Sequence, residues 1–339
     1  MEYKDAGVSI DAADAAKSLI KDLARGTFNG SVLSEIGSFG GMFRPDLRRF
    51  EDPVLVSSTD GVGTKIKVAI AAGIHDTVGY DLVAHCVNDI LVQGAVPLFF
   101  LDYVALGKMD PQRVEQIVRG FARACTEFSC PLIGGETAEM PGTYAEDDYD
   151  LAGFIVGVVE KDKALPRGVK EGDLLLGLPS LGLHTNGYSL ARKVLFDTLG
   201  HRVDTELKEL GTSVGRALLA PHRSYLSALE PLLERDKLRA LVHVTGGGFP
   251  GNIPRVLPKG LAARVRRSAW PVPALFRLIQ KGGGVGEEEM YRTFNMGVGM
   301  IAVVSPSDLH EVEHSLERRG ETSFVIGSVV RGDGVAYED

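Results

Sequence analysis

Two short acidic segments of the sequence carry residue types that bind a divalent cation together with phosphate groups. Residues 60–65 read Asp-Gly-Val-Gly-Thr-Lys, and Asn88 and Asp89 follow farther along the chain. Magnesium is usually held by one or two carboxylates plus phosphate oxygens and water, so Asp60 and Asp89 would suffice if the fold brings them together. The segments predict a magnesium-nucleotide site, and the alternative is an ordinary turn beside a solvated helix face.

The second segment lies in a stretch, residues 76–95, whose apolar residues recur at helical spacing. Its polar residues Asp81, His85, Asn88 and Asp89 follow the pattern i, i+4, i+7 and i+8, which places them within an arc of about 100°. Carboxylates on such a face are either solvated or ligands.

Two glycine-rich segments could approach phosphates. The one Gly-Lys pair, Gly107-Lys108, precedes Met109 and fails the Walker A pattern. Residues 246–251 match G-x-G-x-x-G, but no acid for a ribose follows about twenty residues later. The backbone of Gly246, Gly247 and Gly248 is therefore better read as a phosphate cradle or as a tight turn than as a dinucleotide site.

Three further polar segments allow two readings each. In residues 184–189, Asn186 can cap a helix while His184 binds a substrate phosphate, or His184 is merely exposed. Asn295 faces a ligand or bonds to backbone. The basic run of Arg264, Arg266 and Arg267 fits a solvated edge strand better than a nucleic-acid patch.

The elements that must position these residues alternate between helix and strand, which predicts an α/β (α+β) fold. The expected helices cover residues 11–24, 76–95, 110–128, 186–199, 213–235, 271–281 and 306–319. The expected strands cover residues 53–57, 97–104, 151–159, 174–178, 241–245, 298–304 and 323–330. A polar linker at 160–173 separates an N-terminal domain, 1–165, from a C-terminal domain, 170–339.

Composition limits the partners. A chain of 339 residues exceeds the usual size of one core, so two domains are expected. The net charge of -8 argues against nucleic acid and anionic membranes as partners. Residues 1–5 lack the features of a signal peptide, which indicates a cytoplasmic protein. Cys86, Cys125 and Cys130 form no C-x-x-C pair and are expected to be buried, inert thiols.

Taken together, the segments resemble the aminoimidazole ribonucleotide (AIR) synthetase family, the cyclo-ligases of purine biosynthesis. The resemblance rests on eight ordered blocks, residues 3–8, 58–65, 86–89, 97–103, 134–142, 184–189, 245–254 and 290–299. It implies that ATP phosphorylates the formamide oxygen of formylglycinamidine ribonucleotide, after which a substrate nitrogen closes the imidazole ring and expels phosphate, with Mg²⁺ as cofactor.

The resemblance also implies residue roles. Asp60 and Asp89 would bind Mg²⁺, Lys65 and Lys4 would neutralise the triphosphate, and His184 and Asn186 would meet the substrate. The further residues expected at the ATP and its phosphates are Asp5, Gly61, Gly63, Thr64, Asn88, Glu136, Thr137, Gly246, Gly247 and Gly248. A homodimer follows from the same resemblance, with the N-terminal sheets of two chains paired into a barrel.

Related families fit the sequence less well. A selenophosphate synthetase needs a reactive Cys near its N-terminus, whereas the first cysteine here is Cys86 in a predicted helix. A thiamine-phosphate kinase should lack the blocks at 134–141 and 184–189 in this form. A nucleotide-binding regulator without catalysis is the alternative of another class, and the presence of the acids and the lysine counts against it.

Overall fold

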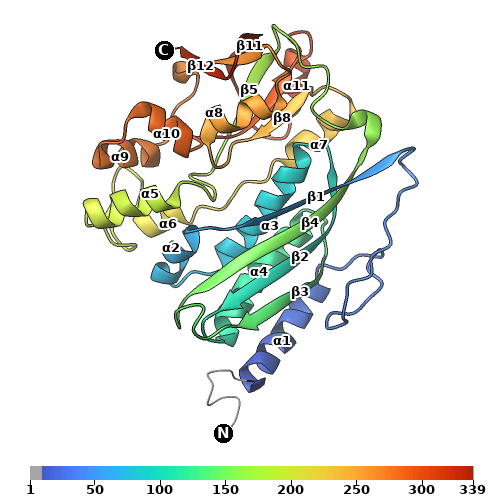
Figure 1. Ribbon diagram of the computed structural model, residues 1–339, viewed down its shortest axis with the longest axis vertical. Coiled ribbons are helices and arrows are strands. Elements are labelled where there is room, and N and C mark those ends of the chain that lie inside the picture. Colours follow the sequence, from blue (N-terminus) through green and yellow to red (C-terminus); the bar gives the residue numbers. More distant parts are fainter. Residues whose placement is uncertain (1–9, 339) are drawn as a thin grey trace.

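The computed structural model describes residues 10–338, which form two lobes, each built on its own β-sheet (Figure 1). Lys4 and Asp5 lie outside the described residues. The first lobe has a four-stranded sheet of order β1-β4-β2-β3, made of β1 Pro53–Gly61, β4 Tyr149–Glu160, β2 Val96–Leu106 and β3 Leu132–Glu139. Only β2 and β3 run parallel, so the sheet is mixed, and with its helices it agrees with the predicted α/β (α+β) fold.

Helices cover one face of this sheet. They are α1 Ile10–Arg25, α3 Asp76–Leu91 and α4 Pro111–Glu127, and the short α2 Lys65–Ala72 follows β1. Asp110 accepts hydrogen bonds from the backbone N–H groups of Gln112 and Arg113, so the predicted N-cap is confirmed. A Cβ on Gly79 would lie 2.1 Å from the carbonyl oxygen of Ile117, which explains how closely α3 packs on α4.

The opposite face of the four-stranded sheet is open, and no helix lies in front of it in Figure 1. Leu55, Phe154 and Tyr103 are 63%, 39% and 37% exposed there. The strand register places all three on one face. Leu55 is paired with Val158 of β4 and Tyr103 with Ala152 of β4, and both partners lie an even number of residues from Phe154, so their side chains point to the same side. An apolar sheet face of this kind marks an interaction surface.

The second lobe is built on a six-stranded sheet of order β12-β9-β11-β5-β10-β8. Its strands are β5 Leu174–Pro179, β8 Ala240–His243, β9 Leu261–Arg266, β10 Val298–Val304, β11 Phe324–Arg331 and β12 Val335–Glu338. The interpretation of the basic run as an edge strand is wrong, because β12 pairs with β9 on its outer side. Arg264 there forms an ion pair with Glu338, with 3.2 Å between Nε and Oε1.

Short helices surround the second sheet. They are α5 Tyr188–Arg192, which continues as a π-helical turn Lys193–Thr198, α6 Val214–Leu218, α7 Leu226–Glu234, α8 Gly248–Asn252, α9 Ala274–Gly283, α10 Glu287–Thr293 and α11 Leu309–Glu317. The helix expected at 213–235 is divided in two, because Pro221 disfavours helical backbone at the preceding residue. The break leaves His222 on an irregular segment.

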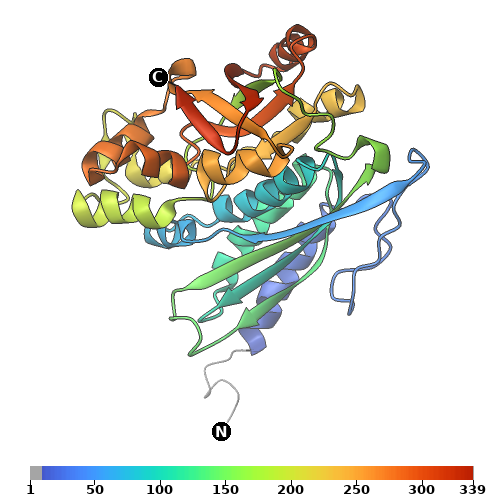
Figure 2. The same cartoon turned by 45° about the horizontal axis from the view of Figure 1, so that its top comes forward.

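Helix α3 lies between the lobes and contacts β1, β2 and β4 of the first sheet as well as α7 and β8 of the second lobe (Figures 1 and 2). Its polar face meets the break between α6 and α7. Asn88 donates to the carbonyl of Arg223 at 2.8 Å and accepts from the N–H of Tyr225 at 3.0 Å. Within residues 10–338, no helix has the length and apolar character needed to cross a membrane.

Candidate active site between the lobes

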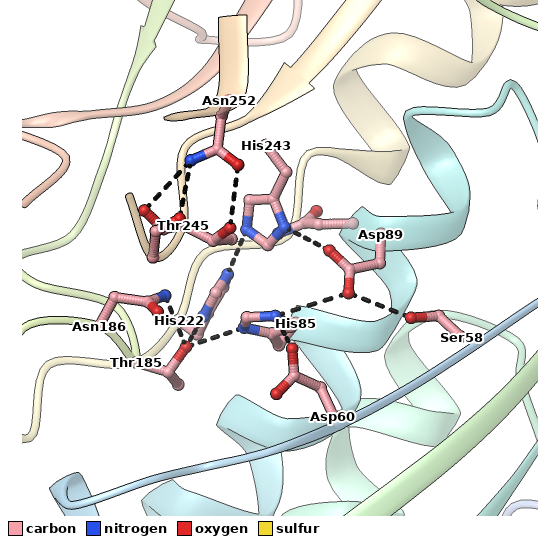
Figure 3. Close-up of polar contacts among 12 residues, drawn as sticks. Ser58, Asp60, His85, Asp89, Thr185, Asn186, His222, His243, Thr245 and Asn252 are labelled. Atoms are coloured by element: carbon pink, nitrogen blue, oxygen red, sulfur yellow. Dashed lines mark hydrogen bonds and ion pairs between the residues drawn. The ribbon is translucent and has the colours of Figure 1, made fainter. Parts of the chain in front are cut away.

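Four acidic and imidazole side chains from different elements meet where the lobes join (Figure 3). Asp60 comes from the end of β1, His85 and Asp89 lie one turn apart on α3, and His243 ends β8. Nε2 of His85 lies 2.7 Å from Oδ2 of Asp60 and 3.5 Å from Oδ2 of Asp89, while Nδ1 of His243 lies 2.8 Å from Oδ1 of Asp89. The two acids singled out in the sequence are therefore brought together.

The local structure explains this convergence. Alternate residues of a strand point to the same face, so Ser58 and Asp60 both face α3. Ser58 donates a hydrogen bond to Oδ2 of Asp89 at 3.1 Å. Residues four apart on a helix lie above one another, which stacks His85 on Asp89. One oxygen of each acid and one nitrogen of His85 lie within 4.8 Å of one another, a set that can hold a divalent cation.

The charges of the cluster depend on its hydrogen bonds. Burial works against ionisation of Asp60 and Asp89, but hydrogen bonds from His85 and His243 and the positive charge of His85 outweigh it, so both carboxyl pKa values lie below their ordinary value. Burial likewise opposes charge on His85, yet the neighbouring acids raise its pKa. Burial lowers the pKa of His243. Both carboxylates are therefore ionised at neutral pH and available to a cation.

The acids line a cleft of about 620 Å³ between the lobes. Ser57 and Ser58 from the first lobe and Thr245, Asn252 and Arg255 from the second lobe also line it. A smaller hollow of about 360 Å³ adjoins the other side of Asp60 and His85. A concave space of this size with a few convergent polar groups is typical of small-molecule sites.

The smaller hollow gathers several of the predicted phosphate residues. Gly61, Gly63 and Asn186 line it beside Asp60 and His85. Gly63 has φ of 63°, a backbone conformation that glycine adopts without strain. Thr64 follows Gly63 in the chain, and its Oγ1 lies 3.1 Å from Oγ of Ser189. The turn after β1 and the loop before α5 are thus adjacent.

Lys65 is placed differently from its predicted role. Its Nζ is 2.7 Å from Oδ2 of Asp81, both side chains have no exposed surface, and it donates to the carbonyls of His184 at 3.1 Å and Ala220 at 2.8 Å. Burial lowers the pKa of Lys65 and raises that of Asp81, while their mutual attraction opposes both shifts. The ion pair lies within the first lobe, between α2 and α3, and the hydrogen bonds to His184 and Ala220 join Lys65 to the second lobe. Lys65 has no exposed surface and lines neither the cleft nor the smaller hollow, so its predicted role at the triphosphate stays a prediction, and Asp81 is not solvated.

Three other candidate residues are also buried. Asn88 is fully buried and bonds to backbone groups of the second lobe, so its side chain joins the lobes, and its predicted role at ATP stays a prediction. His184 is 1% exposed and stacks on His222 with ring centroids 4.1 Å apart. Asn295 is likewise buried and bonds to backbone groups of Gly182 and Gly297, which decides its two readings in favour of a structural role.

The glycine turn at 246–248 lies next to the cleft. Nδ2 of Asn252 donates to the carbonyls of Thr245, Gly246 and Gly248 at 3.3, 3.2 and 2.8 Å, so this side chain fixes the turn. A Cβ on Gly248 would lie 2.0 Å from the carbonyl oxygen of Tyr291. Close packing accounts for this glycine, and the phosphate cradle stays a prediction.

Glu136 and Thr137 lie on β3 and line a different cleft, of about 580 Å³, between the sheet and α1. Lys17, Lys21 and Asp102 also line this cleft. Burial, with a contribution from the charge of Glu136, raises the pKa of Asp102 to about 7. The structure therefore separates these two residues from the acids at the lobe junction.

Three histidines of the junction were not predicted as site residues. His85 lies on the polar helix face recognised in the sequence, one turn before Asp89, and this position was the signal that could have marked it as a site residue. His243 stands shortly before the glycine turn. Nothing in the sequence pattern marks His222, since residues 213–235 read as one helix. The three thiols are buried and free, as expected.

Comparison with known proteins places this geometry in a family. Residues 46–159 match the N-terminal domain, and residues 170–339 the C-terminal domain, of a family described as AIR synthase related protein. The chain is 49% identical over 335 residues to phosphoribosylformylglycinamidine cyclo-ligase of Thermoanaerobacter sp. (strain X514), covering 98% of this chain and 99% of that protein. It is 51% identical over 330 residues to the protein of the same name from Geobacter metallireducens, covering 97% and 95%.

Solved structures share the fold at lower identity. Thiamine-monophosphate kinase from Stenotrophomonas maltophilia K279a superposes with a TM-score of 0.69 at 19% identity, covering 94% of this chain and 96% of that one. Hydrogenase maturation protein HypE in complex with ATP gives a TM-score of 0.62 at 18% identity, covering 93% and 86%. At these identities the likeness shows the two-lobed fold alone.

Proposed function

The chain belongs to the family of AIR synthase related proteins, and we propose that it is an ATP-dependent cyclo-ligase that converts formylglycinamidine ribonucleotide to aminoimidazole ribonucleotide, with release of ADP and phosphate. The observation that carries the proposal is the identity of about half of all residues, over nearly the full length, with relatives of that name. The paired acids in the cleft between the lobes support it.

The reaction needs charge stabilisation and positioning more than covalent chemistry. Phosphorylation turns the formamide oxygen into a good leaving group, and a substrate nitrogen then attacks the same carbon and expels phosphate. Asp60 and Asp89 are ionised and converge from two elements, so they would hold Mg²⁺, which supplies charge neutralisation at the transferring phosphoryl group. Orientation of the two reactants in one cleft supplies the rest.

The turn after β1 is the proposed seat of the nucleotide phosphates. Gly61 and Gly63 leave the backbone accessible, Thr64 adds a hydroxyl, and Asn186 approaches from the second lobe. Gly246, the first of the three glycines at 246–248, lies beside Asn186, since a Cβ on Gly246 would be 3.3 Å from its Oδ1. Lys4 and Asp5 of the N-terminal segment are proposed to add charge at the triphosphate, and Glu136 and Thr137 to shape the nucleotide site.

We further propose a homodimer in which the open sheet faces of two chains pair into a barrel. Leu55, Tyr103 and Phe154 supply an apolar surface on the face that no helix of the described chain covers. A second copy offers the same surface, as a two-fold interface requires. Residues 1–165 and 170–339 would act as the dimerising domain and the domain that completes the active site.

The proposed substrates, ATP and a ribonucleotide, are metabolites of the cytoplasm, and we place the enzyme there. The proposal is tested by mixing the purified protein with Mg²⁺, ATP and formylglycinamidine ribonucleotide and measuring ADP and the aromatic amine product. We expect ADP release only when the ribonucleotide is present. Binding of ATP without ribonucleotide-dependent release of ADP would identify a regulator that keeps the fold without the chemistry.

A further inference from the structure

Three imidazoles from three separate segments surround one point beside the paired acids. His85 comes from α3, His222 from the break between α6 and α7, and His243 from β8, and they are 3%, 0% and 5% exposed. Their ring centroids are 5.1 Å (His85–His222), 4.9 Å (His85–His243) and 5.1 Å (His222–His243) apart. One ring nitrogen of each lies within 4.8 Å of one nitrogen of each of the others.

These distances match three imidazoles on a single metal ion. A zinc–nitrogen bond of about 2.0–2.1 Å puts each ring centroid roughly 3.2 Å from the metal, and tetrahedral angles then separate the centroids by roughly 5.2 Å. Nε2 of His222 and Nε2 of His243 are 3.0 Å apart, against roughly 3.3 Å for two nitrogens on such an ion. For this pair a shift of a few tenths of an ångström would be enough, whereas the nitrogen of His85 lies within 4.8 Å of the other two and has to approach them.

Oxygen atoms around the three rings bond to ring nitrogens, as the hydrogen-bond partners of metal-binding histidines usually do. In metal sites the second nitrogen of a ligating histidine generally bonds to a carboxylate, a carbonyl or water. Here Asp89 is 2.8 Å from Nδ1 of His243, and Asp60 is 2.7 Å from Nε2 of His85. With Nε2 of His85 held by Asp60, the nitrogen of His85 that meets the ion is Nδ1. This nitrogen exchanges its contact with Oγ1 of Thr185 at 2.8 Å for the ion, while the same Oγ1 lies 3.4 Å from Nδ1 of His222.

We propose that His85, His222 and His243 form a site for a divalent transition-metal ion of the Zn²⁺ or Co²⁺ class, distinct from the Mg²⁺ bound by the carboxylates. Imidazole nitrogens favour these ions, whereas Mg²⁺ favours oxygen. Such an ion connects α3 of the first lobe to two segments of the second. It enters through the cleft of about 620 Å³, which His85 and His243 line.

Binding requires one proton movement. The hydrogen bond between the two Nε2 atoms of His222 and His243 needs a proton on one of them, and the ion replaces that proton. The proton moves to Nδ1 of His222, where Oγ1 of Thr185 can accept it, or it leaves to solvent. No oxidant or reductant takes part, because Zn²⁺ and Co²⁺ keep their charge.

The test is a titration of the metal-free, full-length protein with Co²⁺ in the presence of saturating Mg²⁺, followed by visible absorption. We expect one Co²⁺ per chain with the intense bands of a tetrahedral ion. His222→Asn should weaken Co²⁺ binding by at least about tenfold, since loss even of an outer partner costs about 10–100-fold in affinity. The matched control is His75→Asn, because His75 is also buried but bonds to Tyr149 in the first lobe.

A second readout guards against a variant that fails to fold. Zn²⁺ should raise the melting temperature of the wild type and of His75→Asn, because an ion that binds only the folded chain stabilises it. That rise should shrink in His222→Asn and in a second variant, His222→Gln. Circular dichroism of each metal-free variant checks that it has folded.

Two results would overturn the proposal. One is the absence of tetrahedral Co²⁺ bands in the wild type. The other is Co²⁺ binding that His222→Asn leaves unchanged while Asp60→Asn abolishes it, which would assign the ion to the carboxylate pair with His85. Neither result depends on ATP turnover, so a wild type that binds Co²⁺ but releases no ADP would refute the proposed function alone.

Discussion

The buried pair of Lys65 and Asp81 makes a prediction that separates structure from catalysis. Lys65→Met removes a cation whose three partners are Asp81 and the carbonyls of His184 and Ala220. Breaking a buried ion pair by removing one partner costs about 3–5 kcal/mol, because a charge is left unpaired in the interior. With a urea slope near 2 kcal/mol/M, the unfolding midpoint should fall by about 2 M.

A second substitution, at Asp81, tests whether the unpaired charge causes the loss of stability. In Lys65→Met/Asp81→Asn the unpaired charge is gone, while the asparagine oxygen can still accept from the N–H of His222, which Oδ1 of Asp81 holds at 2.6 Å. The double variant should therefore be more stable than Lys65→Met alone. Non-additivity of this kind, about 0.5–3 kcal/mol, is the usual measure of direct coupling.

The matched control lies two residues away. Lys67 pairs with Asp148 at 2.6 Å, but its side chain is 45% exposed. Lys67→Met should change stability by no more than about 1 kcal/mol, as exposed pairs generally do. Equilibrium urea unfolding followed by circular dichroism measures all the variants. The reasoning is refuted if Lys65→Met unfolds at the wild-type urea concentration while its KM for ATP rises tenfold, since Lys65 would then contact the nucleotide.

Three further predictions concern other regions. Burial raises the pKa of Asp102 to about 7 in the folded protein, above its ordinary value of 3.8, so its contribution to the free energy of unfolding is present below pH 4 and is lost as pH rises to 7. Asp102→Asn should therefore gain up to about 4 kcal/mol over wild type between pH 4 and pH 8 in melting experiments, and a constant difference would refute this. Leu55→Lys or Phe154→Asp should convert the proposed dimer to folded monomers in sedimentation, and unchanged mass would reject that face. Gly120→Ala puts a Cβ 2.1 Å from the carbonyl oxygen of Asp76 and should cost about 1–3 kcal/mol in urea unfolding, whereas wild-type stability would show that α3 and α4 can separate.

The regular elements could be predicted because their determinants are local. Asp110 and Pro111 mark the start of α4, and the apolar spacing of residues 76–91 defines α3. The division of residues 213–235 was missed, although Pro221 was visible, because the flanking apolar residues keep helical spacing. The environment of β9 could not be predicted, since β12 reaches it from the end of the chain.

The sequence predicted the site residues that residue type and position after a strand or on a helix face can mark. Asp60 and Asp89 were found through residue type and neighbouring elements, and the fold brings them together. Lys65 stands in the same motif as Asp60, yet its side chain points to Asp81. Its burial could not be predicted, because residues of the second lobe cover it. His222 was missed for the same reason, since its partners come from α3 and β8.

Helix α3 contacts the second lobe through neutral hydrogen bonds of Asn88 and through the charged carboxylate of Asp89, and only the second kind of contact depends on a bound cation. Asn88 holds the backbone of Arg223 and Tyr225 with neutral hydrogen bonds, and these do not depend on what occupies the cleft. Asp89, the next residue, shares its two oxygens between Ser58 of the first lobe and His243 of the second. A cation that binds Asp89 competes with both bonds, because each uses the same negative charge. Binding in the cleft therefore weakens these two bonds without displacing either side chain, while the bonds of Asn88, Lys65 and Asp81 to the backbone of the second lobe keep the lobes docked.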